Sequence, residues 1–211
     1  MVIEPIGYIH TDFKDKFGIP RQCGLVPELS GTIVLKGRYS DPAALRGIEE
    51  FTHLWLIWGF SEARYDNETL TVHPPRLGGK VKKGVFATRS PFRPNSLALS
   101  SVKLEEIEFA EGETRLKVSG IDMLDGTPVY DIKPYVPYSD IHPEARGGFS
   151  DEHKDDCIEV LISDELISMV PEDKRNALIG VLRQDPRAAY NKQNDYVYGL
   201  NFAGLDIRFI C

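Results

Sequence analysis

The stretch HLWLIWGF, residues 53–60, is an apolar and aromatic run of strand length, and it decides the fold. On either side of it, similar short runs rich in β-branched or alternating apolar residues lie at 3–11, 31–36, 84–88, 100–109, 115–121 and 129–135. Gly, Pro and Asp turns separate these runs. Many short strands of this kind favour a closed antiparallel sheet over a doubly wound one. The sequence therefore predicts a mainly β fold, with a small antiparallel β-barrel over residues 1–137.

The other elements are expected at a few places only. Ser40-Asp41-Pro42 has the pattern of a helix N-cap with proline just inside the helix. Residues 138–155 are polar and contain proline and glycine, which is typical of a linker. Residues 156–211 are expected to form a small C-terminal α/β module, with a strand at 157–162, a helix at 172–183, and a hairpin of 196–200 and 205–210.

The amino-acid composition restricts the classes of protein to which this chain can belong. With 211 residues, 42% of them hydrophobic and 27% charged, the chain is expected to be a soluble globular protein. It contains no apolar run of about 18 residues, which argues against a membrane-spanning helix, and no secretory signal pattern. Its three cysteines are far apart and form no CxxC pair or Cys/His cluster. We therefore expect a cytoplasmic protein with neither a disulfide framework nor a metal site.

The charge is unevenly distributed along the chain. The net charge is −7, yet the stretch from Thr69 to Leu104 contains no Asp or Glu and seven Lys or Arg residues. Such segregation produces a local positive field on an acidic body. One interpretation is a solvated basic loop. The other is a surface for an anionic ligand such as a nucleic acid.

The usual nucleotide and hydrolase signatures are missing. No GxGxxG follows a strand, no GxxxxGK[ST] phosphate loop occurs, and Ser90 lies in Arg-Ser-Pro rather than in a GxSxG elbow. The chemistry must therefore come from less familiar segments. The first is KFGIPRQCG (16–24), whose Arg21 and Gln22 suit a carboxylate or a base edge, although an Arg that only ties down the loop fits as well.

Three further segments concentrate polar groups. Residues 74–95 form a proline-stiffened basic loop, for which binding is favoured over a purely structural role. Residues 120–135 contain Asp122, the turn residue Asp125, and Asp131 and Lys133 on one face of a strand. A Lys–Asp pair is more often structural than catalytic, but in a cleft it can shift pKa values. QDPRAAY (184–190), with its arginine and nearby tyrosines, suits either stacking on bases or core packing.

Long blocks of this sequence resemble the TsaA/TrmO-like family, also called YaeB-like proteins, of tRNA methyltransferases that depend on S-adenosylmethionine (SAM). The matching blocks are KFGIPRQCGL (16–25), LRGIEEFTHLWLIWGF (45–60), HPPRLGGKVKKGVFATRSPFRPNSLALS (73–100), IDMLDGTPVYDIKPY (121–135) and QDPRAAY (184–190). The departures are mild: Cys23 stands where a proline is common, and Ser96-Leu97-Ala98 where Pro-Ile-Gly is common.

The resemblance implies properties that the composition does not. The fold would be a SAM-binding β-barrel, unrelated to the Rossmann-type methyltransferases. The protein would be a homodimer, with the cofactor near the subunit boundary. The substrate would be N-threonylcarbamoyladenosine beside the anticodon of a threonine tRNA, methylated on its exocyclic nitrogen.

The reaction itself requires a base. Methyl transfer from a sulfonium is an in-line displacement, so positioning supplies much of the rate. The ureido nitrogen is poorly basic and must lose its proton as it attacks. Asp122 and Asp131 are the candidate bases, with Lys133 orienting the carboxylate or contacting the substrate.

The resemblance also implies binding residues. Arg21 or Arg89 would bind the SAM carboxylate, and the rest of the cofactor pocket would be formed by Gln22, Cys23, Gly24, Leu25, Phe60, Ser61, Leu99, Ile121 and Asp122. Contacts to tRNA are expected from Arg76, Lys80, Lys82, Lys83, Arg93, Asn95, Arg187 and Tyr190. Two alternatives remain open: a SAM- or RNA-binding module without catalysis, and a methyltransferase that acts on DNA or on a small molecule.

Overall fold

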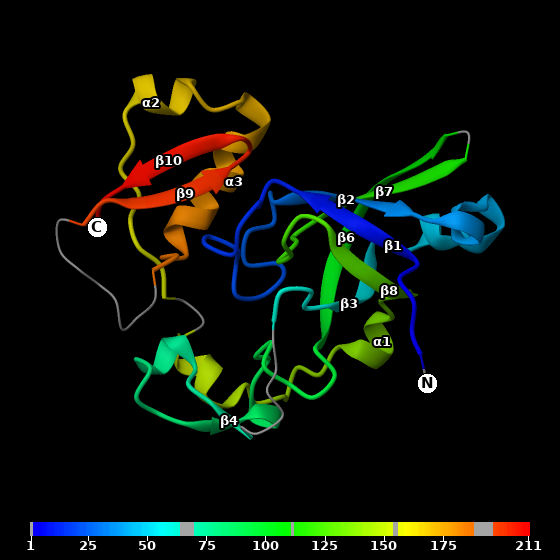
Figure 1. Cartoon of the computed structure of the whole chain (residues 1–211), viewed down its shortest axis with the longest axis horizontal. Helices are drawn as coiled ribbons and strands as arrows, with labels where there is room; N and C mark the ends of the chain where they lie inside the picture. The colour runs from blue at the N-terminus through cyan, green and yellow to red at the C-terminus, as the bar shows by residue number, and fades with distance from the viewer. Residues whose placement is uncertain (1, 64–69, 111, 154–155, 188–195) are drawn as a thin grey trace.

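A computed structural model describes residues 2–63, 70–110, 112–153, 156–187 and 196–211. Six antiparallel strands close into a barrel in the order β1-β2-β7-β6-β3-β8 (Figure 1). Their bounds are β1 (Gly7–Thr11), β2 (Ser30–Leu35), β3 (His53–Gly59), β6 (Leu97–Ala110), β7 (Glu113–Ser119) and β8 (Thr127–Pro134). The predicted antiparallel barrel is therefore confirmed.

Strand β3 shows why the quoted stretch belongs in a barrel. Its side chains alternate between the two faces, so that Leu54, Leu56 and Trp58 are buried inside the barrel. Ile57, between them, points outward. Ile57 is paired with Leu99 of β6 on one side and with Asp131 of β8 on the other, so these two residues also lie on the outer face.

The segment between β2 and β3 contains three short 3₁₀ helices instead of the expected α-helix. They are η1 (Gly37–Ser40), η2 (Pro42–Leu45) and η3 (Ile48–Glu50). The predicted cap exists, because a carboxylate oxygen of Asp41 accepts from the N–H of Ala43 at 2.8 Å. The predicted helix does not continue, because Gly47 adopts a left-handed conformation with φ 87° two residues after η2 ends.

Residues 70–96, between β3 and β6, carry six of the seven Lys and Arg residues of the acid-free stretch and are called the basic segment below. This segment contains β4 (Thr71–Val72), η4 (Pro75–Leu77), β5 (Lys83–Gly84) and η5 (Val85–Ala87). The strand expected at 84–88 is therefore wrong beyond Gly84. The chain turns there because the N–H and hydroxyl of Thr88 both donate to the carbonyl of Val85, at 3.2 and 2.9 Å.

The C-terminal part begins with α1 (Pro137–Asp140), which starts one residue before the predicted linker 138–155, and η6 (Gly148–His153), which lies within it. It continues with α2 (Asp164–Ser168), α3 (Glu172–Arg183), β9 (Tyr198–Phe202) and β10 (Leu205–Phe209). The predicted helix and hairpin are confirmed. The strand expected at 157–162 is wrong. There the N–H of Ile158 donates to the carbonyl of Arg183 at the end of α3, and no sheet forms.

The C-terminal module and the barrel share one hydrophobic core. The ring centroids of Phe13, two residues after β1, and Phe202 of β9 lie 5.5 Å apart. Helix α3 approaches the barrel at Gly180, where an added Cβ would lie 2.5 Å from Cγ1 of Val26. The domain boundaries at 137 and 156 stay predictions. Among the described residues, no helix has the length and apolarity needed to cross a membrane.

Candidate active site

Asp122 is the most perturbed titratable group of the candidate site. It follows β7 in the segment 120–124, between the fully buried Ile121 and Met123. Burial raises the pKa of its carboxyl from 3.8 to about 6, against the opposing effects of hydrogen bonds and of Arg89. A carboxylate of this kind is still ionised at neutral pH, and it is a stronger base than an ordinary aspartate.

Two buried side chains that the sequence analysis missed hold this carboxylate. The hydroxyl of Ser100 donates to Oδ1 of Asp122 at 2.7 Å. The indole Nε1–H of Trp58 donates in turn to Oγ of Ser100 at 2.9 Å. A polar residue on the inward face of β6 is the signal that could have identified Ser100, because the next inward residue, Val102, is apolar.

The loop 16–25 lies against the same segment. The N–H of Gly24 donates to the carbonyl of Gly120 at 2.8 Å, and a backbone hydrogen bond from Cys23 lowers the pKa of Asp122. Burial, and then the charge of Asp122, raise the pKa of the Cys23 thiol. The thiol is therefore neutral and lies beside the carboxylate.

Arg89 brings the basic segment to the site. Its Nη1 donates to Oε1 of Gln22 at 2.6 Å, and its positive charge lowers the pKa values of both Asp122 and Cys23. The structure thus brings together six predicted cofactor residues: Gln22, Cys23, Gly24, Arg89, Ile121 and Asp122. Of the others, Phe60 packs edge-on against Trp58 at 4.7 Å between ring centroids, and Ser61 is exposed.

Asp131 and Lys133 do not join this group within the chain. They form an ion pair of 3.1 Å on the outer face of β8, with side chains 48% and 61% exposed. Leu99 lies on the same outer face and is 51% exposed. The roles predicted for these three residues stay predictions.

Arg21 lies at the seam between the barrel and the C-terminal module. Its guanidinium donates to the backbone carbonyls of Arg187 at 3.2 Å and of Asp185 at 3.5 Å. Arg187 is 8% exposed, and its guanidinium forms two hydrogen bonds with the Asp185 carboxylate, at 2.7 and 3.0 Å. These contacts favour structural roles for both arginines. The predicted tRNA contact of Tyr190 lies outside the described residues.

The basic segment presents cations and aromatic rings to the solvent. Lys80, Lys82 and Asn95 are exposed, whereas Arg93 donates to the carbonyls of Thr88 and Ser90 and so stiffens its own loop. The Lys83 ammonium lies 5.7 Å from the ring centroid of Phe149. For Arg76 the structure describes only the backbone, in η4.

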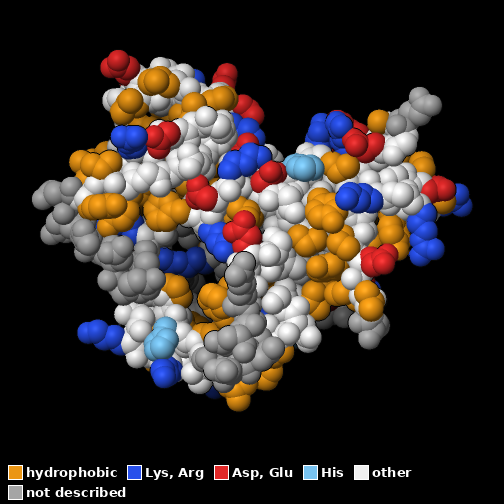
Figure 2. All heavy atoms as spheres, in the orientation of Figure 1, with side chains coloured by type: hydrophobic (Ala, Val, Ile, Leu, Met, Phe, Trp, Pro, Cys, Tyr) orange, Lys and Arg blue, Asp and Glu red, His pale blue; other side chains and the backbone are white. Residues whose placement is uncertain are grey.

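Two exposed phenylalanines lie among these cations. Phe86 is 79% exposed and Phe92 is 50% exposed. The sequence analysis missed both, although their position beside Arg89 and Arg93 in VFATRSPFR is the signal that could have found them. Figure 2 shows a hollow bounded by the barrel, the C-terminal module and this segment, with Lys or Arg side chains in its depth.

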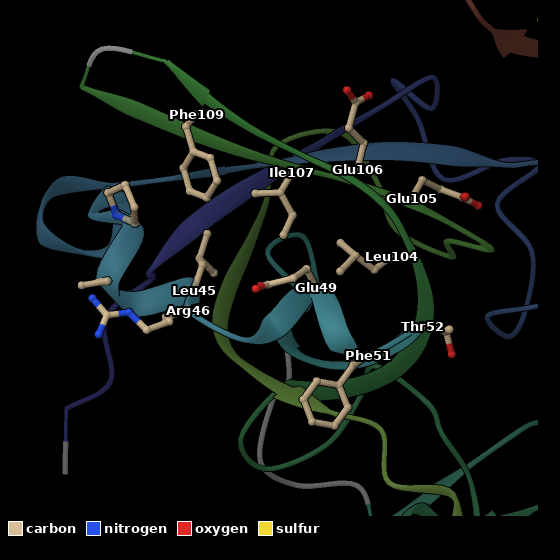
Figure 3. Close-up of a pocket in the computed structure, with 12 residues that line it drawn as sticks. Leu45, Arg46, Glu49, Phe51, Thr52, Leu104, Glu105, Glu106, Ile107 and Phe109 are labelled. Carbon is tan, nitrogen blue, oxygen red and sulfur yellow. The ribbon is translucent and has the colours of Figure 1, made fainter.

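A separate pocket lies away from these residues. It has a volume of about 630 Å³ and is formed by the 3₁₀ segment after β2 and the long β6–β7 hairpin, with Leu45, Ile107 and Phe109 among its apolar walls (Figure 3). None of the predicted site residues lines it. Among the described residues, no cluster of His, Cys, Asp and Glu could hold a metal ion.

A small closed antiparallel barrel is the fold that the resemblance implies for a SAM-dependent methyltransferase of the non-Rossmann type, and Asp122 lies in it beside a basic, aromatic loop. The family model described as the tRNA-methyltransferase O N-terminal domain matches residues 8–141. The chain therefore belongs to the TrmO family, as the resemblance of its sequence blocks predicts.

Individual relatives agree with this assignment. The chain is 40% identical over 195 residues to the tRNA (adenine(37)-N6)-methyltransferase of Escherichia coli, covering 90% of this chain and 83% of that protein. It is similar to a crystal structure of TrmO from Pseudomonas aeruginosa, with a TM-score of 0.80 and 36% identity over 100% of this chain and 90% of that one. The RcsF protein of Pseudomonas aeruginosa, assigned to the SAM-dependent methyltransferases, is 50% identical over 149 residues, which are 71% of this chain and 60% of that protein.

Proposed function

We propose that this protein transfers a methyl group from SAM to the exocyclic nitrogen of N-threonylcarbamoyladenosine at position 37 of a threonine tRNA. The broader assignment, a SAM-dependent tRNA adenine-37 N6-methyltransferase, follows from the family and from its relatives. The observation that carries the proposal in this chain is the buried carboxylate of Asp122, which lies between a candidate cofactor loop and a basic aromatic segment.

The residues present fit SAM. The carboxylate of Asp122 complements a sulfonium charge, and the guanidinium of Arg89 complements an α-carboxylate. Because Arg21 already donates to backbone carbonyls at the module seam, Arg89 is the better of the two predicted carboxylate ligands. When bound, SAM supplies an activated methyl group. Gln22 and the backbone of the loop 21–25 would orient it beside Asp122.

Asp122 is the proposed general base. The ureido nitrogen of the substrate is a weak nucleophile, so it must lose its proton as the new bond to the methyl carbon forms. With a pKa of about 6, the Asp122 carboxylate is ionised at pH 7 and able to accept that proton. The barrel interior excludes water from one side of the carboxylate, because Trp58 and Ser100 fill that side.

The basic segment is the proposed tRNA surface. The lysines at positions 80 and 82 provide charge for phosphates, and the exposed rings of Phe86 and Phe92 provide platforms for unpaired bases. The combination of cations and exposed aromatic rings suits a single-stranded loop, such as an anticodon loop, better than a duplex.

A homodimer would give the outward-facing residues a role. Asp131 and Lys133 lie on the outer face of β8, and Leu99 lies on the adjoining outer face of β6. In a dimer with the cofactor near the subunit boundary, these residues could complete the partner's pocket. We therefore keep their proposed contributions, in a dimeric cytoplasmic enzyme, as part of this proposal.

Methyl incorporation tests the proposal directly. The purified protein is incubated with labelled SAM and two pools of one threonine tRNA, of which only one carries the threonylcarbamoyl group. Label in the modified pool alone, and its loss with Asp122→Asn, is the expected result. Label in both pools would remove the threonylcarbamoyl requirement. SAM binding without label in either pool would favour the alternative of a binding module without catalysis.

A further inference from the structure

Two buried side chains and the half-buried Asp122 form a hydrogen-bonded chain that ends on the candidate base. Trp58 comes from β3, Ser100 from β6, and Asp122 from the segment after β7. The distances are 2.9 Å from the indole Nε1 to Oγ of Ser100 and 2.7 Å from that Oγ to Oδ1 of Asp122. Ser100 is 1% exposed and Trp58 is 6% exposed, so water does not compete for these bonds.

The chain of bonds has only one possible direction. An indole N–H can donate but cannot accept, so Oγ of Ser100 must be the acceptor from Trp58. A serine hydroxyl has a single proton, and this proton points to Oδ1 of Asp122. Oδ1 is therefore held as an acceptor, and a proton that arrives at this carboxyl group has to settle on Oδ2.

We infer that Ser100, oriented by Trp58, is a positioning residue for methyl transfer, which reserves Oδ1 of Asp122 as an acceptor and leaves Oδ2 as the oxygen that takes the substrate's proton. This inference rests on the proposed function, in which Asp122 is the base. In the transfer, the nitrogen–methyl bond forms as the carbon–sulfur bond breaks. The electron pair of that bond stays on sulfur, and the proton of the nitrogen goes to Oδ2.

The groups around Asp122 predict what loss of the hydroxyl does. Burial raises the pKa of Asp122, whereas the bond from Ser100, the backbone of Cys23, its own backbone and the charge of Arg89 lower it. The Cys23 thiol also faces the carboxyl group and is neutral. Removing the Ser100 hydroxyl therefore raises the pKa further, because burial is then less opposed.

Four variants of the full chain test the inference. Ser100→Ala removes the donor, Ser100→Thr keeps a hydroxyl, and Trp58→Phe removes the group that orients it. Ser101→Ala is the matched control, because Ser101 is the neighbouring serine on the opposite face of β6. Two quantities are measured for each variant: the pH profile of methyl transfer at saturating SAM, and the titration of the Asp122 carboxyl carbon by NMR, assigned with Asp122→Asn.

The expected result is an acidic limb and a carboxyl titration that both move to higher pH in Ser100→Ala, by about one unit, with about a fivefold lower rate at pH 6. Trp58→Phe should shift both in the same direction by less, Ser100→Thr should restore them, and Ser101→Ala should change neither. An unshifted titration in folded Ser100→Ala would overturn the inference. A wild-type protein that methylates no tRNA would overturn the proposed function instead, while the NMR titration would still decide whether Ser100 controls the proton on Asp122.

Discussion

Nη1 of Arg89 lies 2.6 Å from Oε1 of Gln22, although 67 positions separate the two residues in the sequence. This hydrogen bond joins the loop 16–25 to the basic segment before β6. The two stretches proposed to bind the cofactor and the tRNA therefore meet at one point. A ligand that engages the Arg89 guanidinium will affect both.

Replacing Arg89 is expected to weaken SAM binding. A charge-assisted hydrogen bond contributes about 1.5–3 kcal/mol, so Arg89→Ala should raise the dissociation constant for SAM by about 10- to 100-fold. Isothermal titration calorimetry with SAM measures this constant. Arg21→Ala is the comparison. If Arg21→Ala weakens SAM binding by about 10-fold or more while Arg89→Ala leaves it unchanged, then Arg21 rather than Arg89 is the ligand of the SAM carboxylate.

Neutralising Asp122 is expected to stabilise the fold above pH 6. The pKa of this carboxyl is about 6 in the folded chain, above its usual 3.8, so the folded state binds the proton more tightly than the unfolded state. Its contribution to stability is therefore fully present below pH 3.8 and is lost as the pH rises through 6. The difference between the folded and unfolded pKa values corresponds to at most about 3 kcal/mol of unfolding free energy.

Urea denaturation of Asp122→Asn checks this sign. At pH 8 the variant should unfold at a higher urea concentration than wild type, and the difference should shrink towards pH 4. A variant that is less stable than wild type at pH 8 would contradict this prediction. It would show that the hydrogen bonds of the charged carboxylate stabilise the fold by more than its burial destabilises it.

Removing one lysine from the basic segment is expected to reduce the salt dependence of tRNA binding. Lys82→Gln should lower the slope of log K against log salt by about one, because one fewer phosphate is neutralised. Lys117→Gln is the control, since Lys117 lies on the far hairpin in ion pairs with Glu106 and Glu108. Filter binding at several salt concentrations measures the slope. Equal slopes for wild type and Lys82→Gln would exclude Lys82 from the contact.

Removing an exposed ring is expected to act differently from removing a charge. Phe86→Ala should weaken binding to the anticodon stem-loop by about 1–3 kcal/mol at every salt concentration, with the slope unchanged. Phe109→Ala is suited as the control, because Phe109 is also exposed but lies beside the separate pocket. Fluorescence anisotropy with a labelled stem-loop measures both. If the two variants bind equally well, Phe86 is not a stacking residue.

The sequence predicted the barrel, helix α3 and the final hairpin well, because each has a strong local pattern. The alternation in residues 53–60 and the apolar face of 172–183 correspond to β3 and α3 within one residue at each end. The expected strands at 84–88 and 157–162 did not form as predicted. Val85 is buried from a 3₁₀ turn and Val160 packs on the core from extended chain outside any sheet. A short apolar run does not distinguish such segments from a strand.

The candidate site was only partly predictable for a related reason. Asp122, Gln22 and Arg89 belong to recognisable blocks. Their proximity depends on the three-dimensional path of the loop 16–25, the basic segment and the segment 120–124, which the sequence does not predict. Ser100 and Trp58 also belong to such blocks, but they lie in strand stretches, and only the register that places them on one inward face makes them partners of Asp122. Conversely, the bidentate pair of Arg187 with Asp185, which favours a structural role, could not be predicted from the sequence, because an arginine beside tyrosines equally suits a phosphate ligand.

The close approach of Gly180 to Val26 limits how this chain can be recombined. A helix that touches the barrel through the missing side chain of a glycine cannot be replaced by a helix from a relative that carries any larger residue there, unless the barrel loop changes with it. The C-terminal module therefore cannot be exchanged independently of the barrel loop that contains Val26. In chimaeras, and over evolutionary time, substitutions at positions 26 and 180 should occur together.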